Sequence, residues 1–439
     1  MSFTTVDAVL PTSRWRDVYL TAGARAVSAC GDYLAAISLA LALQSAGAGG
    51  IAVSGVMLAA ALPLVLLAPL TGRLADRMDS RTLLVGAGGA QAGCCVVLAY
   101  AERVDVILVF VALLACGLAV TQPTLAALLP EMVRRVDLPR ASALNQTAAL
   151  LGMLLAPGLA GLLVGQFGVR VPLLIDAASY LALVAAGLLL RTRRGGRRTT
   201  ASTRPPGPAP VTPAAVAGIR PAAGWRLRRD PLLWTMVVAV AGTIAGVGAV
   251  NVIEVFYVRE TLHASTTMFG LVSTAWILGM LIGAGLLART ARRARDDGAL
   301  AQGVLVLLGL ACLAVALGAV VPAAGWLLPL WLIGGVANGG LNVFSNLVLT
   351  NRVPPAERGR AFAAQGAANQ GAGMFGFLVG GVLLARFAPR PLVAVTGLAG
   401  LAVVLAVTPI VLRAARRERR AGPVTGPEGA ALATSVPAA

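Results

Sequence analysis

The sequence contains no lysine, a single histidine and few charged residues of any kind, and each shortage excludes a class of protein. Charged residues make up 12% of the 439 positions, about half the share found in soluble domains, so a soluble globular protein is excluded. The lack of lysine excludes the Gly-x-x-x-x-Gly-Lys-Ser/Thr loop that binds ATP phosphates. With His263 as the sole histidine, neither a histidine metal site nor a Ser-His-Asp triad is expected. We predict no cofactor and no enzymatic activity.

Cysteines are also few, and their positions argue against metal binding. All five lie inside apolar runs, and none stands at a metal-ligand spacing beside a histidine. We therefore interpret them as small buried hydrophobic side chains. They are Cys30, Cys94, Cys95, Cys116 and Cys312.

Hydrophobic residues, in contrast, account for 58% of the chain and give a mean hydropathy of +0.82. They are grouped in runs of about 20 residues, the length that a helix needs to cross a bilayer core of about 30 Å. Helices are expected because a spanning backbone must form its hydrogen bonds internally. The sequence therefore predicts twelve transmembrane helices, at about 18–42, 51–71, 82–101, 105–127, 143–165, 169–190, 232–257, 267–288, 299–320, 325–349, 362–385 and 391–412.

Arginines cluster at alternate ends of the predicted spans. The net charge is +18, but the basic residues follow the positive-inside rule, which favours membrane topology over nucleic-acid binding. An even number of spans puts both termini on one side, and the arginine-rich loops identify that side as cytoplasmic. We therefore expect a multi-pass plasma-membrane protein, embedded in the lipid bilayer as a monomer, with no nucleic-acid partner.

The longest polar stretch divides the twelve spans into six and six. It is rich in arginine, proline, alanine and glycine without apolar periodicity, so a disordered basic linker is expected there. Six spans on each side of a central loop is the plan of two packed half-transporters. The expected parts are a cytoplasmic N-terminus at 1–17, an N-terminal half at 18–190, the linker at 191–231, a C-terminal half at 232–412 and a cytoplasmic disordered tail at 413–439.

The stretch GRLADRMDSR, between the second and third spans, is unusually charged for this chain. It resembles the loop signature of the major facilitator superfamily, which is Gly, three residues, Asp-Arg, one residue, Gly or Asp, one residue and a basic residue. The Asp form is similar to exporters of the macrolide-efflux and enterobactin-exporter type. The resemblance implies twelve helices in two pseudo-symmetric six-helix halves, with a gate at this loop. Its places are filled by Gly72, Asp76, Arg77, Asp79 and Arg81.

The chemistry of this loop suits a gate. Gly72 allows a tight exit from the second span, and Asp76 is able to meet the positive end of a helix in the other half. Arg77 and Arg81 are able to bridge to nearby acids. The alternative is a solvated loop whose charges only fix the topology.

A second resemblance lies in the fifth span, in GMLLAPGLAG. This stretch is similar to the antiporter pattern Gly-x-x-x-Gly-Pro-x-x-Gly-Gly, with alanines in place of two glycines, and in the family the pattern marks exporters. Gly152, Pro157 and Gly161 keep their places and are expected to take part in gating. Small residues allow close helix approach and proline bends a helix, so ordinary packing is the alternative.

Three ionisable residues inside the spans are candidates for proton coupling, because such groups are costly in a bilayer. Asp32 lies near the middle of the first span, and Arg25 stands two turns away on the same face. The pair is either a proton site or a fixed ion pair. Glu254, near the outer end of the seventh span, is either a second proton or cation site or an acid that reaches the outer surface. Asp176, in the sixth span, is expected to be structural.

Polar amides in the spans are candidates for a substrate cavity. Three asparagines of the tenth span are spaced by four residues and form a stripe along one face, which lines a cavity or joins helices. In the superfamily, helices 1, 4, 7 and 10 line the cavity. Many drug–proton antiporters also carry an arginine inside helix 4, and 105–127 has none. The cavity candidates are Asp32, Gln122, Asn251, Asn338, Asn342 and Asn346.

These observations predict a secondary transporter that exports a small amphiphilic compound, such as a drug or a secreted metabolite, in exchange for protons. An importer or symporter of the same fold is the alternative. A membrane-embedded lipid-modifying enzyme is a weaker alternative. The adjacent acids Asp296 and Asp297 have no second acidic cluster that would complete a metal site.

The linker composition gives a first prediction. Removing about 10 residues between 195 and 222 is expected to leave expression and transport unchanged, because this composition cannot build a packed core. Further shortening is expected to stop function once the linker no longer spans from helix 6 to helix 7. Expression and transport of a deletion series measure both effects. Loss of expression after the first short deletion would show that the linker is structured or bound.

Overall fold

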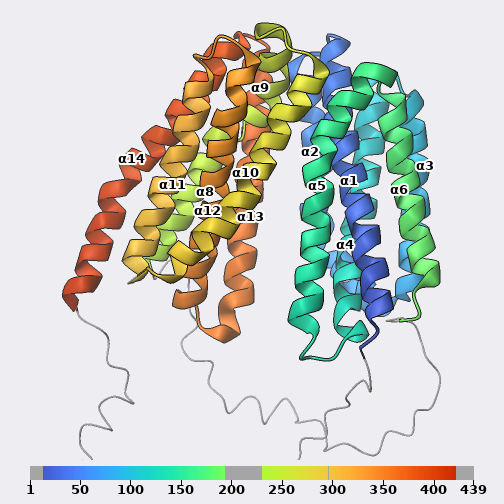
Figure 1. Ribbon diagram of the computed structural model, residues 1–439, viewed down its shortest axis with the longest axis horizontal. Helices are drawn as coiled ribbons and strands as arrows, with labels where there is room; N and C mark the ends of the chain where they lie inside the picture. Colours follow the sequence, from blue (N-terminus) through green and yellow to red (C-terminus); the bar gives the residue numbers. More distant parts are fainter. Residues whose placement is uncertain (1–12, 193–229, 295, 422–439) are drawn as a thin grey trace, which may run out of the picture.

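The computed structural model describes residues 13–192, 230–294 and 296–421, which form helices joined by short turns (Figure 1). Within these described residues, twelve helical segments are long and apolar enough to cross a membrane. The predicted all-α membrane fold is thereby confirmed. The predicted linker at 191–231 lies almost entirely outside the described residues.

Six helices form the N-terminal half, and each overlaps one predicted span. Gly47 and Gly49 follow the first helix and Gly168 follows the fifth, all with positive φ, a conformation that other L-residues adopt only with strain. The helices are α1 (Trp15–Ser45), α2 (Gly49–Arg77), α3 (Ser80–Tyr100), α4 (Val104–Met132), α5 (Leu138–Phe167) and α6 (Arg170–Leu189).

The C-terminal half repeats this plan with one additional break. Its spans are connected by short turns, two of which contain a single 3₁₀ turn. The elements are α8 (Pro231–Val247), α9 (Val250–Phe256), the π-helical turn η2 (Tyr257–Thr261), α10 (Thr266–Arg292), α11 (Asp297–Gly318), η3 (Ala324–Trp326), α12 (Leu327–Arg352), η4 (Pro355–Glu357), α13 (Arg358–Leu384) and α14 (Pro389–Ala421).

The seventh span is not the single helix that was predicted at 232–257. It is divided between α8, α9 and η2, and Gly248 lies at the break between α8 and α9. Glycines of α13 pack directly against this point: a Cβ atom added at Gly376 would lie 2.9 Å from the Cα atom of Gly248. The break thus accompanies a tertiary contact with α13, which the hydropathy of the span cannot reveal.

Two helices extend beyond their predicted ends. α2 continues through Gly72 to Arg77, so the predicted tight exit at Gly72 is wrong, and the chain turns at Met78 instead. α14 continues to Ala421, although 413–439 was predicted to be a disordered tail. The added residues are mainly Ala, Arg and Glu, which favour helix in spite of their charge.

Helices α5 and α10 join the two halves through a contact of bare backbone. A Cβ atom added at Gly161 of α5 would lie 3.1 Å from the Cα atom of Gly270 of α10. The carbonyl group of Pro157 also lies against Gly270. Gly152, in contrast, packs within the N-terminal half, with its Cα face against Ala26 of α1. In the fifth-span pattern, Gly161 and Pro157 therefore contact the other half, whereas Gly152 contacts a helix of its own half.

Helices α2 and α13 form a second contact between the halves. A Cβ atom added at Gly381 of α13 would lie 2.8 Å from the carbonyl oxygen of Gly50 and 2.6 Å from the Cβ atom of Ser54, both in α2. Nearby, Gln44 Nε2 donates a 3.0 Å hydrogen bond to Glu260 Oε1 across the same boundary. Small residues thus bring the halves together at both contacts, as they do in other membrane helices.

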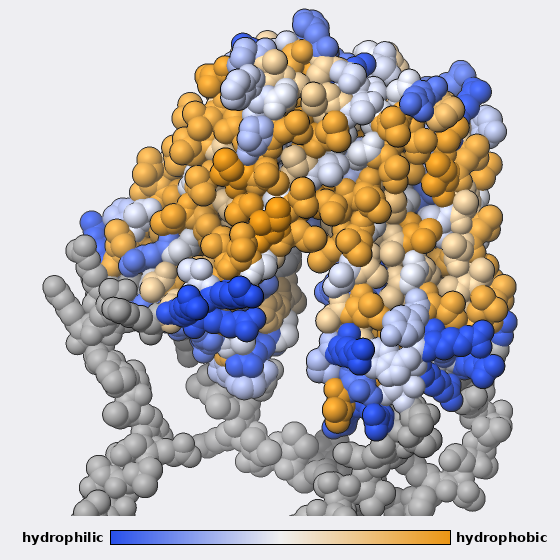
Figure 2. All heavy atoms as spheres, in the orientation of Figure 1, coloured by the Kyte–Doolittle hydropathy of each residue, from blue (hydrophilic) through white to orange (hydrophobic). Residues whose placement is uncertain are grey.

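Both contacts lie at the same end of the molecule, opposite the start of α1 and the end of α14 (Figure 1). Figure 2 shows the other end hollowed between the halves, with hydrophilic side chains around its mouth. A hydrophobic band covers both halves between the two hydrophilic ends. The molecule is therefore closed at one end and open at the end where the described chain begins and finishes.

A side chain at Gly161 is expected to disrupt the closed end. Gly161→Val forces α5 and α10 apart, and overpacking of this kind costs about 1–3 kcal/mol. The apparent melting temperature of the detergent-solubilised protein is expected to fall. Gly89→Val in α3, where an added Cβ atom has no neighbour within 4 Å, is the matched control. Equal melting temperatures for the two variants would contradict the close backbone contact.

Candidate functional site

Asp32 lies in the middle of α1 and faces α6 rather than another charged residue. The hydroxyl group of Tyr180 donates a hydrogen bond to Asp32 Oδ1. Tyr180 is fully buried between the helices, whereas Asp32 is only partly buried. A rigid phenol thus holds the carboxyl group of a residue that is not fully buried.

A second carboxyl group, that of Asp176 in α6, lies beside the backbone of α1. Its Oδ1 atom accepts a 3.0 Å hydrogen bond from Ser179, and its Oδ2 atom accepts one of 3.2 Å from the Cys95 thiol of α3. A Cβ atom at Gly31 would overlap Asp176 Oδ1, so the acid occupies space that Gly31 leaves empty. Asp176 is fully buried. Asp176 was predicted from the sequence to be structural, and the sequence did not indicate that it lies near Asp32.

The expected pairing of Arg25 with Asp32 is not observed. No ion pair within the described residues includes either side chain, and the Arg25 Nε atom is buried without a hydrogen-bond partner. Seven residues along a helix correspond to a rise of about 10 Å, which is too far for direct contact. Two residues on the same helix face are therefore not necessarily in contact. The partner of Asp32 is Tyr180 and not Arg25.

Glu254 belongs to α9, just beyond the break in the seventh span. Trp331 of α12 donates a 3.1 Å hydrogen bond from Nε1 to Glu254 Oε1. Trp331 is 2% exposed, so the acid is bound from inside the C-terminal half. Its partner was not identifiable from the sequence, because the two residues are far apart in the chain.

Two of the predicted cavity amides donate hydrogen bonds to residues three or four positions earlier in the chain. Asn342 Nδ2 donates to the carbonyl oxygen of Asn338 at 3.0 Å, and Asn251 Nδ2 donates to that of Gly248 at 3.1 Å. Within the described residues, the side chains of Asn338, Asn342 and Asn346 make no hydrogen bond to another helix. Gln122, Asn251, Asn342 and Asn346 are exposed. This pattern favours a polar wall over amides that join helices.

The gate residues predicted in the stretch between the second and third spans lie at the open end. Asp79 caps α3, where its Oδ1 atom accepts a 3.3 Å hydrogen bond from the backbone nitrogen of Arg81. Arg77 is exposed, and no ion pair of the described residues includes it or Arg81. Asp76 lies in the last turn of α2, and its side chain is outside the described part of the structure. The gating role of these residues stays a prediction.

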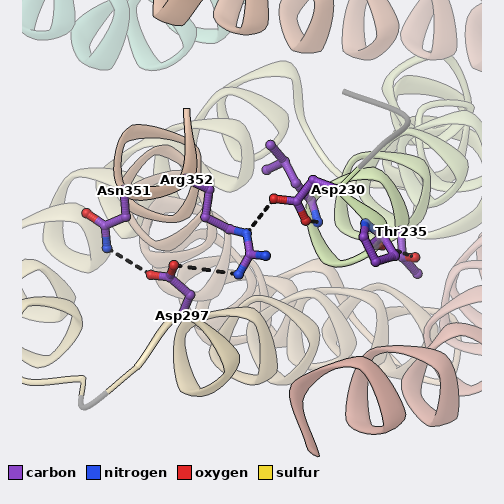
Figure 3. A network of polar contacts seen from close by, with 7 residues as sticks. Asp230, Thr235, Asp297, Asn351 and Arg352 are labelled. Carbon is purple, nitrogen blue, oxygen red and sulfur yellow. Dashed lines mark hydrogen bonds and ion pairs between the residues drawn. The ribbon is translucent and has the colours of Figure 1, made fainter. Parts of the chain in front are cut away.

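At the same end, an acid–arginine network joins three helices of the C-terminal half (Figure 3). Arg352 of α12 lies 2.6 Å from Asp230 Oδ2, before α8, and 3.7 Å from Asp297 Oδ2, in α11. Asn351 also donates to Asp297, and the other oxygen of Asp230 caps α8 through the backbone nitrogen of Leu233. Arg352 thus ties the helix ends of this half together.

The N-terminal half has corresponding connections made by other residues. Asp17, 2% exposed, accepts hydrogen bonds from the backbone and hydroxyl groups of Thr192, at 3.0 and 2.7 Å, so α1 is tied to the end of α6. Before α5, a hydrogen bond from the Ser13 hydroxyl, followed by contact with Arg134, lowers the pKa of Asp137. Each half therefore has its own internal ties at the open end.

The acid pair that supported an enzymatic alternative has structural contacts. Asp296 Oδ1 accepts a 2.6 Å hydrogen bond from the backbone nitrogen of Ala299 and caps α11. Asp297 contacts Arg352 and Asn351. Among the described residues, no three histidine, cysteine or acidic side chains converge as metal ligands.

Known proteins resemble this chain along most of its length. The family profile described as Major Facilitator Superfamily matches residues 21–293 and 238–437. YfiS of Bacillus subtilis (strain 168), described as an uncharacterized MFS-type transporter, is 24% identical over 360 residues, which cover 81% of this chain and 84% of YfiS.

Solved structures share the fold at lower identity. A bacterial homologue of the iron transporter ferroportin, in an inward-facing state, is 18% identical with a TM-score of 0.68, over 92% of this chain and 99% of that one. The nucleoside transporter NupG is 14% identical with a TM-score of 0.69, over 90% of this chain and 98% of its own. At these identities the likeness extends to the fold alone.

Removing one charge from the C-terminal network is expected to destabilise that half. Asp230→Asn keeps a good helix cap but loses the charged contact with Arg352, a loss of about 1–3 kcal/mol for partly buried groups. The melting temperature of the purified protein measures the effect. Asp105→Asn is the control, because Asp105 and Arg103 form an ion pair that is exposed to solvent and contributes little. No difference between the two variants would contradict the role of the network.

Proposed function

Because the chain belongs to the major facilitator superfamily, we propose that it exports a small amphiphilic compound, a drug or a secreted metabolite, in exchange for protons. The observation that carries the proposal is the position of Asp32. This partly buried acid lies in the middle of α1, one of the helices that line the cavity in this superfamily, and its carboxyl group accepts a hydrogen bond from Tyr180. An intramembrane acid marks a pathway for ions or protons. The open end is taken as the cytoplasmic one, because the arginine-rich loops lie there.

The arrangement of the halves supports alternating access. The halves touch at one end through Gly161–Gly270 and Gly50–Gly381, and they are separated at the other (Figure 2). Internal ties hold the helix ends of each half together, so each half is able to move as a near-rigid body. Rocking about the central region then closes the cytoplasmic end as the outer contacts separate.

Proton exchange at Asp32 links this motion to transport. In the cytoplasm-open state, substrate entering the hollow displaces the proton of Asp32 into water, and the resulting carboxylate accepts the hydrogen bond of Tyr180. After the halves rock, a proton from the outer side returns to Asp32 and the substrate leaves. One proton moves inward for each compound exported, and no bond other than the O–H bond is broken.

An amphiphilic substrate suits the composition of the helices that face the hollow in this fold. Exposed amides of Gln122, Asn251, Asn342 and Asn346 offer hydrogen bonds, while the neighbouring positions are mostly apolar. An importer of the same fold would use the same residues with the opposite direction of flux. Transport assays in inside-out and right-side-out vesicles distinguish the two.

Asp32→Asn is expected to abolish transport driven by a proton gradient, because the amide cannot bind and release a proton. Export of a fluorescent amphiphile, chosen from a screened panel, is measured in inside-out vesicles, and proton release on addition of that compound is measured in detergent. Asp105→Asn serves as the control, because it removes an exposed acid in the first turn of α4. Gradient-driven export equal to the wild type in Asp32→Asn would remove this residue from the coupling role.

A further inference from the structure

We infer that Asp176 is the second member of the proton site, so that Asp32 and Asp176 together hold one proton. The inference rests on the proposed proton coupling and gives a role to a buried acid that the mechanism above does not use. It replaces Arg25 with Asp176 as the group that governs the charge of Asp32.

The geometry places the two carboxyl groups on adjoining sides of one helix–helix contact. Asp32 accepts from Tyr180 of α6, and Asp176, one turn before Tyr180 in the same helix, lies against Gly31, the residue next to Asp32. The missing side chain at Gly31 brings the acid of α6 up to the backbone of α1. Substitution of any larger residue would separate the two helices at this point.

Among the described residues, no arginine forms an ion pair with either acid. The titratable groups facing them are Arg25, Cys30 and Tyr33 of α1, Tyr180 of α6 and Cys95 of α3. Arg25 makes no ion pair among the described residues. Two neighbouring carboxylates without a paired cation cannot both stay ionised in a medium of low dielectric constant. One proton must therefore remain with the pair, as in other pairs of buried acids.

Hydrogen bonds and burial assign different tasks to the two acids. Asp176 accepts bonds from Ser179 and Cys95, one at each oxygen, and these bonds favour its charged form against the cost of its full burial. Asp32 is a partly buried residue whose carboxyl group accepts a hydrogen bond from Tyr180. Asp32 is therefore the acid that exchanges the proton with water, and Asp176 is a positioning residue whose negative charge keeps that proton in place.

The test counts protonated carboxyl groups in the purified wild-type protein at neutral pH, without substrate. The protein is labelled with ¹³C-carboxyl aspartate, so that the infrared C=O band of protonated aspartate is separated from that of glutamic acids such as Glu254. The account expects one protonated aspartate. Zero or two would overturn it, and this measurement does not require any variant to fold.

Variants then show whether the proton belongs to the pair. Asp32→Asn and Asp176→Asn are each expected to lose the same band completely, and the double variant to lose no more than either one. Such non-additivity is expected of coupled groups. A band that survives in Asp176→Asn would assign the proton to Asp32 alone, and one that survives in Asp32→Asn would assign it to Asp176 alone; either result overturns the inference. Asp105→Asn, with the band unchanged, is the control.

The result is separable from the proposed function. A shared proton in a protein whose export is independent of the proton gradient would overturn the coupling but keep the pair. Gradient-driven export that is lost in Asp32→Asn, combined with an unchanged band in Asp176→Asn, would keep the coupling and overturn the pair.

Discussion

Close backbone contact between α5 and α10 is the constraint on which the rest of the structure depends. Gly161 and Gly270 meet without side chains, and the parallel contact of Gly50 with Gly381 joins α2 to α13 at the same end. Because the halves meet there, the hollow opens only at the other end (Figure 2). The glycines therefore define which side of the membrane a solute reaches in this state.

Charged groups in the bilayer region impose the second constraint. The network around Arg352 and the bonds to Asp17 lie at the open end, where they tie helices within each half. Asp32 and Asp176, in contrast, lie within the N-terminal half, where they accept hydrogen bonds from hydroxyl and thiol groups and form no ion pair among the described residues. The first group ties helices within each half, and the second is the pair on which the proposed proton coupling rests.

The sequence predicted the twelve spans well, because runs of about 20 apolar residues are long enough to cross a bilayer and are easily recognised. It missed the break at Gly248 and the extension of α2 to Arg77, since both depend on contacts or on turn chemistry outside the hydropathy pattern. Asp32 was chosen as a candidate site residue because an acid inside a membrane span is costly. Its partner was not, because Tyr180 is 148 residues away, and helix periodicity pointed to Arg25 instead.

Distances across both ends of the molecule test the central claim, that two rigid halves close one end at a time. Spin labels on non-canonical residues at 77 and 360 report the open end, and labels at 46 and 387 report the closed end, with the five native cysteines unchanged. Across pH and substrate conditions in lipid bilayers, the account predicts that the two distances change in opposite senses. A population in which both ends are open, or in which the distances vary independently, would contradict it.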